Sequence, residues 1–224
     1  MAAPVNSGSR AELPMRCRSC AGSFDAALAP FTCPTCQALV PPHPSVSPFT
    51  RLGLDRPRFA IDEKAVEAAW LQRCRVVHPD KCMRKSDAER RCAVEQTAAL
   101  NDAWRLLRVP FDRAWALLHK AGVPAAPLRQ GLLLSFMQAR EDAECSAEAR
   151  GVVIADSVAR FGVVMKLAAL ELARVDDVDN GYGDPSPELP RLRVVAAQLA
   201  EAQTLARLVD DLGGECLLPS LPRR

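Results

Sequence analysis

Residues 76–89 read Val-Val-His-Pro-Asp-Lys-Cys-Met-Arg-Lys-Ser-Asp-Ala-Glu and contain signals for a helix end and for a helix start. Proline fixes its own φ and disfavours the α conformation of the preceding residue, so Pro79 predicts a helix end and a loop that displays His78 and Asp80. The run Ser86–Glu89 has the spacing of a capping box, which predicts the start of another helix. Two helices joined by a short loop are expected to pack antiparallel.

Helical periodicity extends on both sides of this loop. Upstream, apolar residues recur every three or four positions from an expected N-cap at Asp62, which predicts a helix of about four turns. Downstream, an apolar stripe with a period of about 3.5 residues continues to Leu107, and Pro110 is expected to end that helix. A further short helix is expected over residues 114–120.

The second half of the chain predicts a small bundle of three helices. Apolar residues recur at helical spacing through Leu133, Met137 and the flank of Arg140, then over residues 153–172 and 192–212. A Gly-Gly pair after the last segment is typical of a helix C-cap. No segment alternates with a period of two, so short strands are expected only around the N-terminal cysteines.

Four of the nine cysteines form two Cys-x-x-Cys pairs that are separated by 12 residues. This spacing suits two knuckles that present thiolates to one tetrahedral zinc ion, and a site with four thiolates is closed, so the zinc is expected to be structural. A redox pair or a set of buried structural cysteines are the alternatives, but the βαβ context of thiol–disulfide exchange enzymes is absent from the pattern. The expected ligands are Cys17, Cys20, Cys33 and Cys36. Cys74, Cys82, Cys92, Cys145 and Cys216 are expected to be ordinary helix residues.

Charge is distributed unevenly, although the formal net charge is only +2. Residues 70–86 carry a net charge of +4, whereas residues 131–215 hold 8 Arg and Lys against 15 Asp and Glu. Two different partner surfaces are therefore expected. The balanced total gives no footprint for a phosphate backbone, so no nucleic-acid partner is expected and a zinc-ribbon nucleic-acid binder is the weaker alternative. No apolar run approaches the roughly 18–20 residues of a bilayer crossing, so no membrane partner is expected.

Four further motifs carry a family resemblance. They are Phe49-Thr-Arg-Leu-Gly-Leu54, His78-Pro-Asp-Lys81, Asn101-Asp-Ala-Trp-Arg-Leu-Leu107 and Pro110-Phe-Asp-Arg-Ala114. With them, residues 47–118 resemble the J domain of the HscB family, co-chaperones of iron–sulfur cluster biogenesis, and the last motif distinguishes this family from general J proteins. The zinc module followed by Pro41-Pro42 resembles that of the eukaryotic members.

The resemblance implies a first partner, a DnaK-type 70-kilodalton heat-shock chaperone whose ATPase the loop would stimulate. The residues that would bind this chaperone are Arg73, Arg75, His78, Pro79, Asp80 and Lys81. The chain itself is expected to be no enzyme, because no residues in the sequence form a catalytic set. A general protein-folding co-chaperone is the alternative within the J-protein class.

The resemblance also implies a second partner, the scaffold protein on which iron–sulfur clusters are assembled. The run Leu132–Asp142 resembles the family segment that opens the C-terminal bundle and binds this scaffold. By that match, the scaffold-binding residues are Leu132, Leu133, Leu134, Met137, Gln138 and Glu141, with Gln138 where the family usually has an acidic residue. The alternative is that the leucines build the core of the bundle.

The sequence and the resemblance together predict an all-α protein, a J-domain helical hairpin and a three-helix bundle with a small zinc module. The expected parts are a disordered or targeting tail (1–14), the zinc-binding module (15–39), a linker (40–48), the J domain (49–121), the scaffold-binding bundle (128–215) and a tail (216–224). The odd cysteine count in a long chain without a secretory leader favours a reducing compartment. The resemblance favours the mitochondrial matrix, with the cytoplasm as the alternative, because residues 1–16 are only a weak transit-peptide signal.

Overall fold

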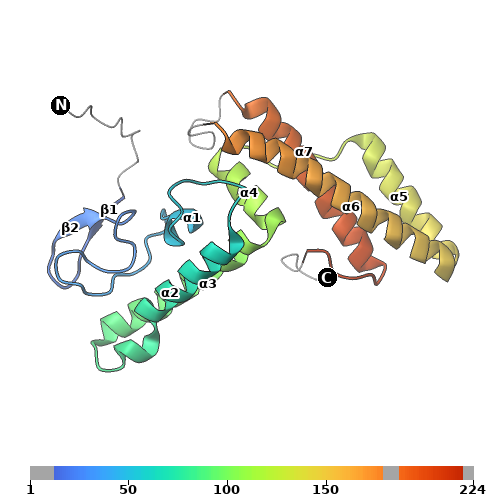
Figure 1. Ribbon diagram of the computed structural model, residues 1–224. Helices are drawn as coiled ribbons and strands as arrows, with labels where there is room; N and C mark the ends of the chain where they lie inside the picture. Colours follow the sequence, from blue (N-terminus) through green and yellow to red (C-terminus); the bar gives the residue numbers. More distant parts are fainter. Residues whose placement is uncertain (1–12, 179–186, 219–224) are drawn as a thin grey trace. The chain divides into compact units, whose positions relative to one another are not determined.

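The computed structural model describes residues 13–178 and 187–218 (Figure 1). The chain divides into two units, one formed by the residues up to Arg56 together with Asp62–Arg108, the other by Pro57–Ile61 together with the residues from Val109 onward. Most of the tail expected at 1–14, part of the tail expected at 216–224 and the middle of the loop before the last helix lie outside the described residues.

The first unit begins with a small hairpin and continues as helices. Met15 lies opposite Phe24 in the antiparallel hairpin, and strands occur only in this cysteine-rich part of the described chain, as predicted. The elements are β1 (Pro14–Arg16), β2 (Ser23–Asp25), α1 (Pro48–Arg51), α2 (Glu63–Val77), the 3-10 helix η1 (Pro79–Cys82) and α3 (Asp87–Arg108).

Helices α2 and α3 form the predicted hairpin. Trp70 of α2 stacks on Trp104 of α3 with the ring centroids 5.7 Å apart, and its Nε1 donates a hydrogen bond to Oδ1 of Asn101 over 3.1 Å. The predicted N-cap is confirmed, because the Asp62 side chain accepts hydrogen bonds from two backbone N–H groups of the first turn of α2. Val66, Val77, Ala93, Leu100 and Leu107 are buried along the expected stripes.

A buried polar network joins the cysteine-rich hairpins to α1 and α3. Nε2 of Gln96 donates to the carbonyl oxygens of Pro30 and Val40, over 2.7 Å and 2.9 Å. Its Oε1 accepts a hydrogen bond of 3.1 Å from Arg51, which also donates to the carbonyl of His43. Both Gln96 and Arg51 are almost completely buried. Residues 40–48, which the prolines predict to be a linker, are therefore held against α1 and α3.

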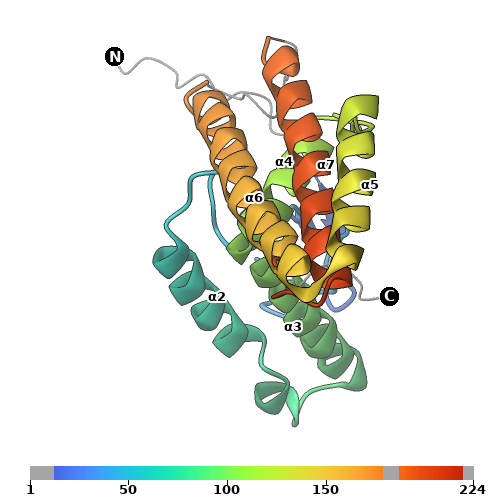
Figure 2. The ribbon, with the colours of Figure 1, turned by 90° about the vertical axis from the view of Figure 1, so that its right-hand side faces the viewer.

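The second unit is helical in its described part. Figure 2 shows α5 (Gln130–Cys145), α6 (Ala147–Asp176) and α7 (Leu189–Asp211) side by side, and α6 makes its most extensive contacts with α7. These helices confirm the predicted three-helix bundle. Leu172, Leu192, Leu199, Leu205 and Val209 are buried in its core. In the described residues, no helix is both long and apolar enough to cross a membrane.

Helix α4 (Pro110–Lys120) is longer than the helix expected over residues 114–120. The expectation was short by one turn because Pro110, which ends α3, also stands at the first position of α4, where a missing N–H costs nothing. Helix α4 packs against α7. The guanidinium of Arg113 in α4 lies over the ring of Phe59, 5.1 Å from its centroid. The backbone N–H of Phe59 donates a hydrogen bond to the carboxylate of Asp176. Parts of the predicted J domain thus belong to the second unit.

A substitution of Gln96 tests the buried network. Gln96→Leu should lower the free energy of unfolding of the first unit by about 2–4 kcal/mol, because two carbonyls and a guanidinium lose a buried partner. The control Thr97→Ala should change it by less than about 0.5 kcal/mol, since this hydroxyl bonds only to its own helix. Urea unfolding followed by the fluorescence of Trp70 and Trp104 in a Trp115→Phe background measures both values. Equal stabilities for the two variants would contradict the role given to Gln96.

Candidate functional site

The four predicted metal ligands come together in the first unit. The Sγ atoms of Cys17, Cys20, Cys33 and Cys36 all lie within 4.8 Å of one another, with 3.6 Å between Cys17 and Cys36 and 3.7 Å between Cys20 and Cys33. Sulfur atoms about 2.3 Å from a tetrahedral metal are about 3.8 Å apart. The spacing of the thiols therefore fits one tetrahedral metal ion.

Each Cys-x-x-Cys pair lies on a knuckle of the same geometry. In the first, the N–H of Cys17 donates to Gly22 and its carbonyl accepts from Ala21, both over 2.9 Å. The second knuckle repeats these bonds between Cys33, Ala38 and Gln37. The residue after each second cysteine is left-handed, with φ near +60° at Ala21 and Gln37. The backbone N–H groups of Ser19 and Thr35 bond to the sulfur atoms of Cys17 and Cys33, and the N–H of Ala38 bonds to that of Cys36.

Backbone N–H groups favour the thiolate form at each of these sites, whereas the neighbouring sulfur atoms lower the pKa of Cys33 and raise the pKa of Cys36. Hydrogen bonding from the backbone of Cys36 lowers the pKa of Cys33 to about 6, and the backbone of Cys20 lowers the pKa of Cys17. The backbone of Ala38 acts in the same direction on Cys36, but burial and the three neighbouring cysteines raise its pKa to about 12. Four thiols this close together suit a metal ion at their centre, because a cation there stabilises the thiolate form of each ligand.

The other cysteines do not join this cluster. Within residues 13–178 and 187–218, these four ligands are the only group of three or more Cys, His, Asp or Glu side chains close enough to hold a metal. The five other cysteines carry free thiols. The two Cys-x-x-Cys pairs alone therefore form the candidate metal centre.

The His-Pro-Asp loop begins where α2 ends. His78, with φ −56° and ψ 130°, is the C-cap of α2 and the N-cap of η1, which Pro79 opens. The imidazole Nδ1 accepts a hydrogen bond of 3.2 Å from the backbone N–H of Asp80. The side chains of His78 and Asp80 are 51% and 80% exposed. Nε2 and the carboxylate are thus available to a partner.

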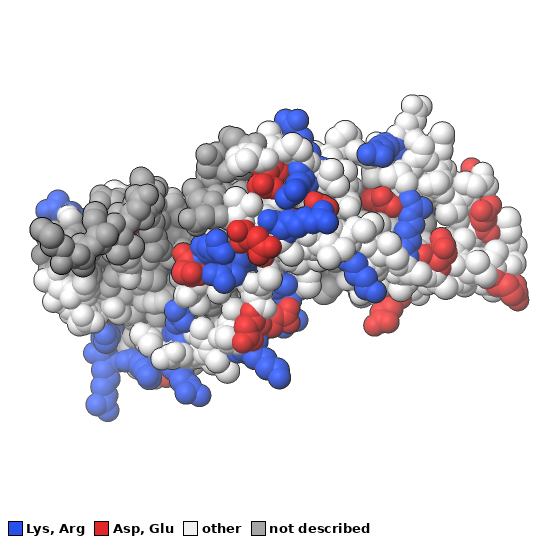
Figure 3. All heavy atoms as spheres, turned by 45° about the horizontal axis from the view of Figure 1, so that its top comes forward, with Lys and Arg blue, Asp and Glu red and all other residues white. Residues whose placement is uncertain are grey.

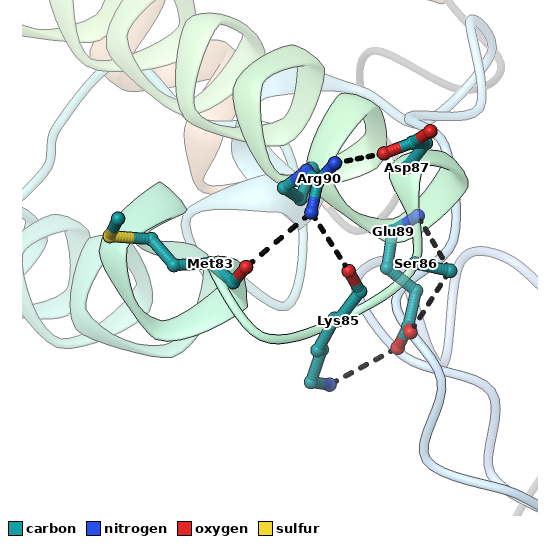
Figure 4. Close-up of polar contacts among 6 residues, drawn as sticks. All are labelled: Met83, Lys85, Ser86, Asp87, Glu89 and Arg90. Carbon is teal, nitrogen blue, oxygen red and sulfur yellow. Dashed lines mark hydrogen bonds and ion pairs between the residues drawn. The ribbon is translucent and has the colours of Figure 1, made fainter.

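A capping box fixes the start of α3 beyond this loop (Figure 4). The hydroxyl of Ser86 accepts from the backbone N–H of Glu89 over 3.3 Å, and the Glu89 carboxylate accepts from Nζ of Lys85 over 3.1 Å. Burial acts to raise the pKa of Glu89, but the bonds from Lys85 and Ser86 hold it below its ordinary value. The predicted box is therefore present, with Lys85 as an additional donor.

The basic residues around the loop differ in exposure. Arg75 and Lys81 are exposed, whereas Arg73 is half-buried. Its Nη1 donates to the carbonyl of Ala69, its guanidinium lies against Gly53, and burial lowers its pKa. Figure 3 shows Lys and Arg side chains gathered at the end of the α2–α3 hairpin, at the lower left, while Asp and Glu are frequent over the bundle. Arg73 thus supports the hairpin more than it extends this basic surface.

Helix α5 does not bury the stripe through Leu133, Met137 and Arg140. Phe136 and Ala143 are buried, and Leu132 and Ala139 are half-buried. The sequence leaves open whether these leucines build the core or bind a partner, because two apolar stripes with the same period run along this helix and only packing selects between them. Arg160 of α6 secures the buried stripe, since it lies 5.7 Å from the Phe136 ring and pairs with Glu201 of α7 over 2.7 Å.

The other stripe leaves an apolar face on α5. Leu133, Leu134 and Met137 are 48%, 59% and 54% exposed, and Gln138 and Glu141 are exposed beside them. At about 100° per residue these five positions share an arc of about 140°. Leu132 is half-buried outside that arc. We call these five residues the α5 face.

Comparison with known sequences gives the family. No protein-family profile matches the chain. It is 31% identical over 169 residues to the co-chaperone protein HscB homolog of Azoarcus sp. (strain BH72), a match that covers 73% of this chain and 91% of that protein. It is 45% identical over 75 residues to the HscB homolog of Bordetella avium (strain 197N), which covers 34% of this chain and 44% of that protein.

Comparison with solved structures gives the same fold. The human co-chaperone protein HscB superposes with a TM-score of 0.68 at 19% identity, over 89% of this chain and 97% of that one. The chaperone HscB from Vibrio cholerae superposes with a TM-score of 0.52 at 24% identity, over 75% and 95%. Together with the matched length and identity of the Azoarcus relative, this fold shows that the chain belongs to the HscB family of co-chaperone proteins.

Proposed function

We propose that this protein is an adaptor that stimulates the ATPase of a DnaK-type 70-kilodalton heat-shock chaperone and presents an iron–sulfur cluster scaffold protein to it. The observation that carries the proposal is the placement of two exposed sites on different units of the chain, the His78–Asp80 loop on the first and the α5 face on the second. Membership of the HscB family supports the iron–sulfur context.

The loop acts by binding and not by chemistry. Its exposed imidazole and carboxylate lie at the end of a basic hairpin, where complementary charge on a chaperone would raise the encounter rate and fix the orientation of docking. A ligand shifts a conformational equilibrium only through its different affinities for the two states. The loop therefore stimulates hydrolysis by binding the hydrolysis-competent conformation of the chaperone more tightly than its resting conformation.

The α5 face receives the scaffold protein. Its three exposed apolar side chains are bordered by Gln138, Glu141 and Asp142, which is the arrangement of a small interface with an apolar centre and a polar rim. Binding the scaffold on the same chain as the loop raises its effective concentration at the chaperone without any new contact. The bound scaffold protein and the His78–Asp80 loop then stimulate the ATPase of the chaperone together.

The metal of the cysteine site is zinc with a structural role. Four thiolates at tetrahedral spacing are typical of structural zinc sites. Cys17, Cys33 and Val40 form the small core of this module, with Met15 and Phe24 against it. A core of this size cannot hold the fold alone. Metal binding free energy would therefore be folding free energy here.

The loop is tested by His78→Gln. Stimulation of the chaperone ATPase should fall at least about tenfold, while the free energy of unfolding should change by less than about 0.5 kcal/mol because the imidazole is exposed. His119→Gln, at an exposed histidine of α4, is the matched control and should stimulate normally. A His78 variant that stimulates like the wild type would refute this role of the loop.

The α5 face is tested by combining Leu133→Ala, Leu134→Ala and Met137→Ala. Scaffold binding should weaken by about 2 kcal/mol, or about thirtyfold, as is typical when interface hot spots are truncated. Stimulation of the chaperone without scaffold should be retained.

The control replaces three other exposed apolar residues, Val163, Leu167 and Leu170 of α6, by alanine and should bind the scaffold normally. Titration calorimetry with the scaffold measures both variants. If neither the wild type nor the control binds the scaffold, a general protein-folding co-chaperone becomes the better assignment.

The metal site is tested by zinc content and chelation. Reduced protein should contain about one zinc per chain, and Cys20→Ser should lower the content below about half, whereas Cys145→Ser, at an exposed free thiol, should not. Chelation should also lower the melting temperature of the α2–α3 hairpin, because Gln96 and Arg51 bond to carbonyls of the module and its connection. Zinc-free protein with an unchanged melting temperature would contradict this coupling.

A further inference from the structure

The turn that follows the His-Pro-Asp sequence is held by Arg90 of α3 (Figure 4). Its Nη1 donates to the carbonyl oxygen of Lys85 over 3.1 Å and approaches that of Met83 at 3.4 Å. Its Nη2 pairs with the carboxylate of Asp87. One guanidinium thus bridges two backbone positions of the turn and the first residue of α3.

The two carbonyls that Arg90 reaches are among those that accept no backbone bond within the turn. Backbone bonds in this segment run from Lys81 to His78, from Met83 to Asp80 and from Lys85 to Cys82. These bonds occupy the carbonyls of His78, Asp80 and Cys82. Arg90 therefore completes the hydrogen bonding where the backbone ladder stops.

Few other contacts fix the turn. Cys82 is buried, but Lys81, Met83, Arg84 and Lys85 are exposed. Burial of Cys82 anchors the middle of the segment, and Arg90 anchors its far end together with the ion pair between Lys85 and Glu89. A segment with so few buried side chains opens easily when one anchor is removed.

We propose that Arg90 is a positioning residue for chaperone activation, because it holds the turn that carries His78 and Asp80 in the conformation that binds the chaperone. This inference rests on the function proposed for the loop. A planar guanidinium can bond several acceptors in fixed directions, whereas an ammonium is a point charge. The role thus belongs to the geometry of arginine and not to its charge alone.

Loss of the Arg90 hydrogen bonds should weaken the apparent affinity of this protein for the chaperone and leave the maximal ATPase stimulation intact. When only a fraction of the molecules holds the competent loop, the apparent dissociation constant rises by the inverse of that fraction. Once bound, His78 and Asp80 are the same side chains as in the wild type. The expected signature is a higher concentration of this protein at half-maximal ATPase stimulation with an unchanged maximum.

The test compares Arg90→Lys and Arg90→Met with Arg91→Met in the full-length chain. Arg91 is the exposed neighbour of Arg90, so its replacement removes the same charge but none of the hydrogen bonds that Arg90 makes to the turn. Both Arg90 variants should raise the half-maximal concentration about threefold to tenfold and speed hydrogen exchange at the amides of Met83 and Lys85. Arg91→Met should shift the half-maximal concentration less than about twofold.

Two results would overturn the proposal while the proposed function stands. One is wild-type stimulation and wild-type amide exchange in both Arg90 variants. The other is an equal shift in Arg91→Met, which would assign the effect to charge. A wild-type chain that stimulates no DnaK-type chaperone would instead refute the proposed function, and this inference with it.

Discussion

The pairing of α2 with α3 through the stacked rings of Trp70 and Trp104 is the interaction on which the first unit depends. It joins the middle of α2 to the C-terminal part of α3, and η1, which follows His78, packs against the same helix. The same helix α3 carries Gln96, whose side chain binds the cysteine-rich hairpins. One helix thus organises both the loop and the metal module.

Much of this architecture can be predicted because its signals are local. Pro79, the Asp62 cap and the capping box at Ser86 act within one turn of the chain, and the two Cys-x-x-Cys pairs carry their spacing in the sequence. The register of α5 could not be predicted, because the stripes through Leu132 and Leu133 have the same period. The choice between them depends on the helices that α5 packs against.

Contacts distant in the sequence leave no local signal. A glutamine on a helix usually lies at the surface, yet Gln96 is buried and binds carbonyls 56 and 66 residues away. The bond from Phe59 to Asp176 spans 117 residues, and no local pattern in the sequence indicates it. The bonds of Arg90 end on backbone carbonyls, which every residue possesses, and sequence alone could not single them out.

The proposed adaptor function requires that one chain carries both activities, and mixing two variants tests this requirement. A chain with His78→Gln is expected to lack the loop activity, and a chain with alanine at Leu133, Leu134 and Met137 is expected to lack the scaffold site. ATP hydrolysis by the chaperone is measured with scaffold present, for the wild type and for an equimolar mixture of the two variants. If tethering on one chain is required, the wild type shows a scaffold-dependent acceleration and the mixture does not. A mixture that restores the full acceleration would contradict the adaptor account.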